Sequence, residues 1–190
     1  GNGGADTLQG GNGNDLVYGG ADDDSLFGDT ESVPGIGGDD SIFGEDGSDV
    51  IDGGAGNDIA YGGNGSDTLN GVAGDDTLFG GEDADTISGD AGADLVYGDD
   101  GDDLLRDTVD GSTVHGGQGN DTVVVNAAAS EVHGGADDDS VIGSSGGDLV
   151  YGDEGNDSVF AGDGTDELWG GDGNDLIYGQ TASDTLFGGE

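Results

Sequence analysis

Aliphatic residues recur at every ninth position of this chain, and glycine and polar residues fill the positions between them. The clearest copies of the nine-residue unit are GGNGNDLVY at residues 10–18 and GGDGNDLIY at residues 170–178. Nineteen of twenty consecutive units carry Leu, Ile or Val at the eighth position, and Ala60 is the exception. Successive side chains of a strand point to opposite faces. Each unit therefore predicts a short strand at its last three residues, with the eighth residue in a core and its two neighbours facing out.

The first, second and fourth positions of the unit are mostly glycine. They predict a tight turn with left-handed or closely packed backbone before each strand. Asn or Asp often follows at the fifth position, and both residues tolerate left-handed geometry. Because the twenty units cover residues 1–187, we expect one repeat array over residues 1–190, with a loop insertion at residues 28–34. The chain contains no Met, so we expect it to be an excerpt of a longer protein.

The ninth position shows that the true period is eighteen residues. The even-numbered units carry Tyr18, Phe43, Tyr61, Phe79, Tyr97, His115, His133, Tyr151, Trp169 and Phe187 at this position. The odd-numbered units carry Gln9, Phe27, Asp52, Asn70, Ser88, Arg106, Val124, Ile142, Phe160 and Tyr178. All ten even residues have an aromatic or imidazole ring, against three of the ten odd residues. This difference predicts an all-β solenoid with two units per coil, in which odd strands form one parallel sheet and even strands form the other.

The sixth position is Asp in eighteen of the twenty units. These residues are Asp6, Asp15, Asp24, Asp40, Asp49, Asp58, Asp67, Asp76, Asp85, Asp94, Asp103, Asp121, Asp139, Asp148, Asp157, Asp166, Asp175 and Asp184. Two even units carry Ser112 and Ser130 instead, and Val114 and Val132 keep the core position there. The sequence therefore predicts a continuous coil with an unbroken row of carboxylates along the odd turns and an interrupted row along the even turns.

The charge of the chain opposes its folding. Asp and Glu number 44, Lys and Arg together number one, and the formal net charge is −43. Such a polyanion resists collapse unless something cancels its charge. It lacks the cations needed to bind nucleic acid through phosphates, and an anionic membrane would repel it. No apolar run approaches the length of a membrane span, and the absence of Cys excludes disulfides and thiolate metal sites.

A divalent cation would supply the missing positive charge. Stacked coils place one glycine-rich turn directly over the next, so that Asp carboxylates and turn carbonyls converge from both turns. This set of hard oxygen ligands suits Ca²⁺, whereas Mg²⁺ requires a smaller octahedron and Zn²⁺ prefers His and Cys. We therefore expect the chain to be disordered without calcium and to fold around it.

The nonapeptide G-G-x-G-x-D-x-U-x, where U is aliphatic, resembles the repeat of the RTX, or haemolysin-type calcium-binding, family. The resemblance implies a right-handed parallel β-roll with calcium held between the turns of one unit and the second unit after it. It also implies that the eighteen sixth-position Asp residues are metal ligands, with no normal site at Ser112 or Ser130. The resemblance further implies export by a Gram-negative bacterium through type I secretion, with folding in extracellular calcium.

The calcium content can be counted from the turns. Ten odd and ten even turns leave eighteen gaps between stacked turns, and three of the even gaps involve the units of Ser112 and Ser130. The expected number is therefore about fifteen ions, which would reduce the net charge to about −13.

Two functional readings follow from this fold. The first is a structural module of a secreted or cell-surface protein, such as a filament or surface layer, which the absence of capping sequences favours. The alternative is a non-catalytic module of a larger secreted enzyme or toxin. No catalytic constellation is evident, and His115 and His133 are interpreted as members of the ring column. That column either stiffens the even sheet or forms a contact face for self-association, and sugar stacking is the weaker alternative.

Overall fold

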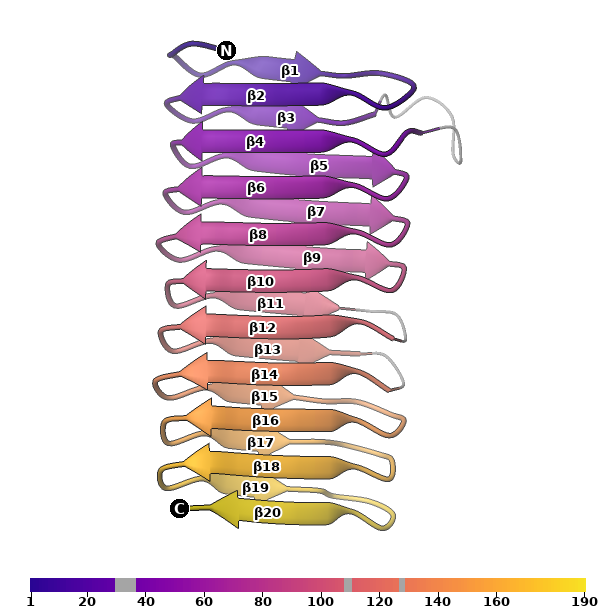
Figure 1. Ribbon diagram of the computed structural model, residues 1–190, viewed down its shortest axis with the longest axis vertical. Coiled ribbons are helices and arrows are strands. Elements are labelled where there is room, and N and C mark those ends of the chain that lie inside the picture. The colour runs from indigo at the N-terminus through magenta and orange to yellow at the C-terminus, as the bar shows by residue number, and fades with distance from the viewer. Residues whose placement is uncertain (30–36, 108–110, 127–128) are drawn as a thin grey trace.

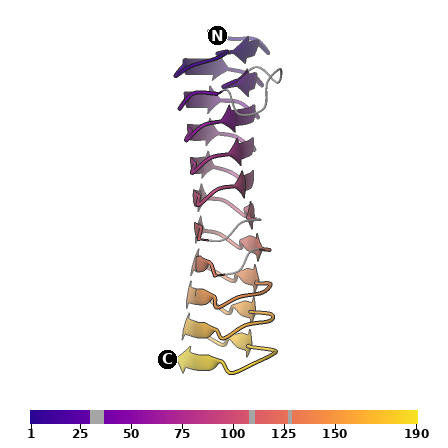
Figure 2. The same cartoon turned by 90° about the vertical axis from the view of Figure 1, so that its right-hand side faces the viewer.

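The computed structural model describes residues 1–29, 37–107, 111–126 and 129–190. Within these ranges the chain forms twenty strands, one in each nonapeptide, and they wind into a flattened solenoid of ten coils. The two termini lie at opposite ends of the stack (Figure 1). Turned by 90°, the stack shows two separate layers of strands (Figure 2). The prediction of an all-β two-sheet solenoid is confirmed.

The odd strands form one ten-stranded parallel sheet in sequence order. They are β1 (Thr7–Gln9), β3 (Ser25–Phe27), β5 (Val50–Ala55), β7 (Thr68–Ala73), β9 (Thr86–Ala91), β11 (Leu104–Asp107), β13 (Thr122–Val125), β15 (Ser140–Ile142), β17 (Ser158–Phe160) and β19 (Leu176–Tyr178).

The even strands form the second ten-stranded parallel sheet, also in sequence order. They are β2 (Leu16–Ala21), β4 (Ser41–Asp46), β6 (Ile59–Asn64), β8 (Thr77–Glu82), β10 (Leu95–Asp100), β12 (Thr113–Gln118), β14 (Glu131–Ala136), β16 (Leu149–Glu154), β18 (Glu167–Asp172) and β20 (Thr185–Gly189). Figure 1 shows the odd turns along one edge of the roll and the even turns along the other.

Neighbouring strands of a sheet pair in the register that the sequence period predicts. Tyr61 lies beside Phe79, eighteen residues later, and Val114 lies beside Val132. The eighth residue of each unit faces the interior, and these residues form a single buried column from Val17 to Leu168, to which Val125 and Ala161 add. Ala60, the one small residue of the column, is fully buried as well.

Most even strands are longer than the three residues that the sequence predicts. β6, for example, continues through Gly62 and Gly63 of the following unit. A side chain on Gly62 would collide with the carboxylate of Asp67, which explains the glycine at the first position. Gly63 has φ +120° and lies just before Asn64, the last residue of the strand. In this unit the first glycine thus allows close packing of the turn, and the second adopts a positive φ that favours glycine.

The fifth position has a different role from the one expected. In the regular units that the structure describes, left-handed residues lie at the second and fourth positions and not at the fifth. The fifth-position side chains instead bond along the roll. Asn156 donates its backbone N–H and its side-chain amide to Asp138 Oδ1, at 2.7 Å and 2.8 Å. Asn and Asp suit this position because their short side chains accept a hydrogen bond from the adjacent coil.

The loop insertion begins after a regular turn residue. A side chain on Gly28 would collide with the Asp40 carboxylate, so Gly28 takes the place of a first glycine. Asp29 follows and accepts the N–H of Ala55 through Oδ2 at 2.9 Å, and residues 30–34 of the expected insertion lie outside the described residues. The strands on either side keep their pairing, with Leu16 beside Ser41.

Candidate metal centre

The sixth-position Asp side chains point into the turns at both edges of the roll. Fourteen of the eighteen are buried, with exposed fractions of 1–3%. The other four, Asp6, Asp15, Asp175 and Asp184, are partly buried and belong to the terminal coils. The structure therefore brings the eighteen carboxylates into two columns, one along the odd turns and one along the even turns.

From the second coil onward, each carboxylate is held by the backbone of the preceding coil. Asp67 donates its N–H to Asp85 Oδ1 at 2.8 Å, and Asp85 donates its N–H to Asp103 Oδ1 at 2.7 Å. The same bond recurs along both edges at 2.7–3.2 Å. A charge-assisted bond of this kind contributes roughly 1.5–3 kcal/mol. Stacking of the turns thus orients the carboxylates, and the carboxylates in turn hold the turns in register.

The second oxygen of these carboxylates has no hydrogen-bond partner. Buried and unpartnered Oδ2 atoms occur in Asp15, Asp24, Asp40, Asp49, Asp58, Asp67, Asp76, Asp85, Asp94, Asp103, Asp121, Asp139, Asp148, Asp157 and Asp166. A Cβ added to Gly80 would meet both Asp85 Oδ2 and the carbonyl oxygen of Gly98, so a carboxylate and a main-chain carbonyl approach the same point. Buried anionic oxygens without donors require a cation or a proton.

Burial makes these carboxyl groups hold protons more tightly. Desolvation raises the pKa of Asp67, Asp76, Asp85, Asp121 and Asp139 to about 7, although a backbone hydrogen bond opposes the shift. The same balance raises the pKa of Asp58, Asp94 and Asp103 to about 6. A bound divalent cation would reverse this effect, because it favours the ionised form.

The chemistry of the donors suits calcium. Within the described ranges, no group of three or more His, Cys, Asp or Glu side chains gathers as a metal cluster. The oxygens that approach one another in the turns come from carboxylates and from backbone carbonyls, as at Asp85 Oδ2 and the carbonyl of Gly98. Calcium accepts six to eight such oxygens in flexible geometry, whereas zinc requires nitrogen or sulfur.

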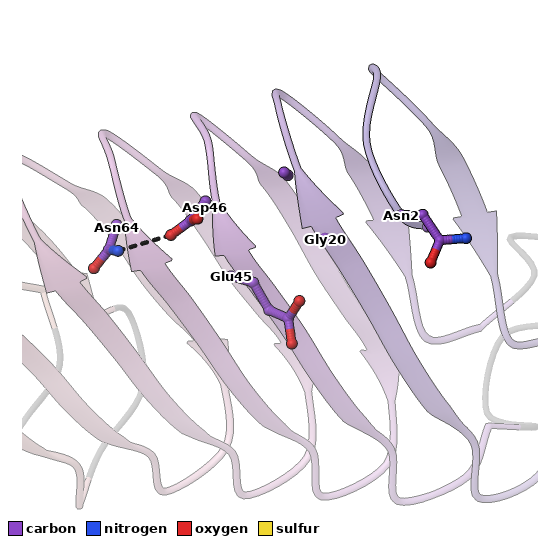
Figure 3. A pocket seen from close by; sticks show the side chains of 7 residues that line it. Asn2, Gly20, Glu45, Asp46 and Asn64 are labelled. Carbon is purple, nitrogen blue, oxygen red and sulfur yellow. Dashed lines mark hydrogen bonds between the residues drawn. The ribbon is translucent and has the colours of Figure 1, made fainter.

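The outer rim of the odd turns is polar at the N-terminal end. A shallow groove there is lined by Asn2, Gly20, Glu45, Asp46 and Asn64 (Figure 3), and also by Gly1 and Ala21. Asn64 donates its side-chain amide to Asp46 Oδ1 at 2.8 Å. This side-chain bond joins adjacent coils outside the carboxylate column.

The ring column of the even sheet is a continuous stack. From Tyr18 to Tyr151 adjacent ring centroids lie 4.6–5.0 Å apart with interplanar angles of 17° or less. Tyr151 and Trp169 are farther apart, at 6.3 Å. Each ring covers the face of the next, so only ring edges point outward. This geometry disfavours stacking of sugars, which would need free ring faces.

The two histidines belong to this stack, as the sequence predicts. His115 and His133 have centroids 4.7 Å apart. Burial and the neighbouring His133 lower the pKa of His115. His133 Nδ1 lies 3.3 Å from Asp153 Oδ2, and its Nε2 lies 3.4 Å from Glu131 Oε1. The sequence reasoning missed these two acidic partners, which the period of eighteen and the strand alternation could have placed beside the imidazole.

The odd sheet also carries a shorter apolar column that the sequence reasoning missed. Val124, Ile142, Phe160 and Tyr178 lie side by side on β13, β15, β17 and β19. Ile142 and Tyr178 are exposed, and Phe160 stacks on Tyr178 with centroids 5.2 Å apart. The signal was present in the ninth-position residues of the last four odd units.

Comparison with known families agrees with this geometry. The profile of the RTX calcium-binding nonapeptide repeat matches residues 1–31, 34–69, 70–105, 115–150, 133–168 and 160–190. The chain belongs to this RTX family. Its repeats make it a calcium-binding repeat module with a β-solenoid fold. No individual curated protein gave a significant match. The described part of the RTX chain has no helix of the length and apolarity that crossing a bilayer requires.

Proposed function

We propose that this RTX chain is a calcium-folded structural module of a secreted or cell-surface bacterial protein, with the eighteen sixth-position Asp residues as ligands. The observation that carries the proposal is the column of buried Oδ2 atoms without hydrogen-bond partners. Each of these oxygens faces a turn whose backbone carbonyls can complete an oxygen shell. Calcium bound there would neutralise the carboxylates and join successive coils.

Extracellular calcium fits this arrangement. With a formal net charge of −43, the chain resists compaction until many divalent ions bind. Extracellular calcium modules typically bind with dissociation constants of roughly 0.1–1 mM. Export of an unfolded chain followed by folding outside the cell, as in type I secretion, matches a chain that needs calcium at nearly every turn. About fifteen ions are expected, nine of them along the odd edge.

Calcium titration of a turn variant tests this proposal. Asp85→Ala should weaken calcium-induced folding, because Asp85 Oδ1 holds the backbone of Asp67 and its Oδ2 is buried without a partner. Far-UV circular dichroism should show a disordered chain in chelator and β structure in millimolar calcium. Glu82→Ala removes an exposed acid three residues earlier and should leave the titration unchanged. Strong β signal in excess chelator at neutral pH would contradict calcium-driven folding.

The even sheet offers a contact face for self-association. Its stacked rings form an apolar ridge on an acidic surface, and Tyr18, Tyr61 and Trp169 are 37–45% exposed. Sedimentation in saturating calcium should distinguish the native chain from a variant in which Tyr61, Phe79 and Tyr97 are replaced by Thr. Association of the native chain alone supports a filament or layer. Identical monomers would instead favour the alternative, a non-catalytic module of a larger type I-secreted enzyme or toxin.

A further inference from the structure

The chain contains four Asn–Gly pairs, at residues 2–3, 12–13, 64–65 and 70–71. In such a pair the backbone nitrogen of glycine can attack the preceding side-chain amide, because glycine has no Cβ to obstruct the approach. Asn64 is the last residue of β6 and is exposed. Gly65 follows it with φ +113°. This pair lies outside the carboxylate columns, and the proposed calcium sites make no use of the Asn64 side chain.

The folded chain holds the two reacting groups from opposite sides of β6. Asn64 donates its side-chain amide to Asp46 Oδ1 on β4 at 2.8 Å (Figure 3). Gly65 donates its N–H to the carbonyl oxygen of Glu82 on β8 at 3.1 Å. Since β6 lies between β4 and β8 in the even sheet, both neighbouring coils must release the pair before the Gly65 nitrogen can reach the Asn64 side chain.

The reaction of such a pair consists of two steps. The Gly65 nitrogen bonds to Asn64 Cγ and the Cγ–Nδ2 bond breaks, so that ammonia leaves with the proton that Gly65 loses and a cyclic imide remains. Water then opens the imide at either carbonyl carbon, which leaves an aspartate or an isoaspartate at position 64. The reaction therefore needs only water and freedom of the backbone at this position.

Both products would disturb the contacts that join the coils at this point. An aspartate at position 64 has no amide to donate to Asp46, and it would lie in register between Asp46 and Glu82, which makes a row of acids on adjacent strands. Like charges directly opposite each other destabilise a sheet. An isoaspartate lengthens the backbone by a carbon atom, which displaces the carbonyl oxygen of Asn64 from the N–H of Gly47 that it accepts at 2.9 Å.

We propose that Asn64 is a site of spontaneous deamidation, which the calcium-bound roll suppresses and the metal-free chain permits. The inference rests on the proposed calcium-driven folding. In the roll the pair reacts only during local opening of the strand end, whereas the disordered chain leaves both groups free. Time spent without calcium should therefore leave a lasting chemical change, which raises the calcium concentration that later folding requires.

Two other positions supply comparisons for Asn64. Among the described residues, no hydrogen bond involves the side chain of Asn2 or the N–H of Gly3, so the Asn2–Gly3 pair lacks both of the bonds that hold Asn64 and Gly65. Gln118, at the same third position of a later unit, donates its side-chain amide to Asp100 Oδ1. Glutamine can therefore replace Asn64 as a donor between coils.

Peptide mapping by mass spectrometry tests the site. The native chain is incubated at neutral pH in saturating calcium or in excess chelator, and the deamidated fraction at Asn64 is followed with time, with Asn2 as the internal reference. Deamidation at Asn64 should be at least about tenfold slower in calcium than in chelator, because the reaction requires local opening of the strand end. The rate at Asn2 should differ by less than about twofold between the two conditions.

The effect on folding has a matched control. After incubation in chelator, the native chain should need at least about twice as much calcium for half of its β signal, and freshly prepared Asn64→Asp should show a comparable increase. Asn64→Gln keeps a side-chain donor but reacts much more slowly, because glutamine must form a larger ring. The same incubation should therefore change the calcium requirement of Asn64→Gln less than that of the native chain.

Circular dichroism of the two incubated samples separates failure of this inference from failure of the proposed function. If calcium folds the chain but Asn64 reacts equally fast in calcium and in chelator, calcium-driven folding stands and the protection of Asn64 is wrong. If the β signal is strong in chelator, calcium-driven folding itself fails, and protection by calcium fails with it. Folding of Asn64→Asp at the native calcium concentration would refute the effect of the reaction on calcium binding.

Discussion

In the absence of metal, protonation of the buried turn carboxyls at low pH should allow the chain to fold. Eight turn carboxyls have their pKa raised to about 6 or 7, chiefly by burial: Asp58, Asp67, Asp76, Asp85, Asp94, Asp103, Asp121 and Asp139. The ordinary value in an unfolded chain is about 3.9. A carboxyl pKa that is raised on folding means that the protonated, neutral carboxyl stabilises the folded chain. This stabilisation is fully present below about pH 4 and is lost as the pH rises through about 6 to 7.

The size of the effect is sufficient to decide whether the chain folds. A shift of about two to three units corresponds to about 3–4 kcal/mol for each group. The turns lie at the edges of the roll, where water screens charge, so half of this value is a better guide. Eight groups then differ by roughly 12–16 kcal/mol between low and neutral pH, which equals or exceeds the total stability of a typical domain.

Circular dichroism of protein stripped of metal on a chelating resin provides the assay. The β signal should rise as the pH falls from about 8 to about 4, with a midpoint near the raised pKa values. In the presence of calcium, acid should have the opposite effect, because protons compete with calcium for the same carboxylate oxygens. The calcium concentration at half-saturation should therefore increase as the pH falls. Sedimentation of the acid form separates folding from aggregation.

A pair of matched variants distinguishes the turn carboxyls from the overall charge. Substitution of Asn for Asp67, Asp85, Asp103 and Asp121 removes four buried charges and should allow β structure in metal-free protein at higher pH. Substitution of Gln for Glu82 and Glu154 together with Asn for Asp100 and Asp172 removes four exposed charges and should shift the midpoint much less. Equal shifts in the two variants, or no gain of β signal in acid, would refute the reasoning.

Two further predictions concern the backbone and the core. Val72 is a β-branched residue held at φ +82°, a conformation that favours glycine. Val72→Gly should therefore stabilise the calcium-bound form by about 1 kcal/mol in thermal unfolding. Val50→Gly, the control at a similarly exposed strand position, should destabilise it. Leu78 is fully buried, so Leu78→Ala should reduce the free energy of unfolding by about 2–5 kcal/mol; the same change at Leu186, which is 47% exposed, should cost less than about 1 kcal/mol.

The sequence predicted those features that repeat with a fixed period. The core column is one example, since every buried eighth-position residue was identified, and the two sheets followed from the alternation at the ninth position. The ring stack also follows directly, because parallel strands in register place Tyr61 beside Phe79. Such features depend only on strand geometry, which is the same in every coil.

The sequence did not predict features that depend on contacts between successive turns. The role of the fifth residue was misassigned, since Asn was expected for its tolerance of left-handed geometry but serves through hydrogen bonds to the adjacent coil. Strand length was underestimated for the even strands and for β5, β7 and β9, because there the first glycine of the following unit extends the strand instead of beginning the turn. β1, β3, β15, β17 and β19 have the three residues that the sequence predicts.

The interrupted part of the even edge shows that two separate sets of interactions join the coils. Through the units of Ser112 and Ser130, β12 and β14 keep their register, and Val114 and Val132 remain fully buried. The ring stack also continues without a gap, through His115 and His133. The core and the rings therefore hold the even sheet together where the regular carboxylates are missing. Because these contacts need no metal, the even sheet keeps its register where its column of turn carboxylates is interrupted.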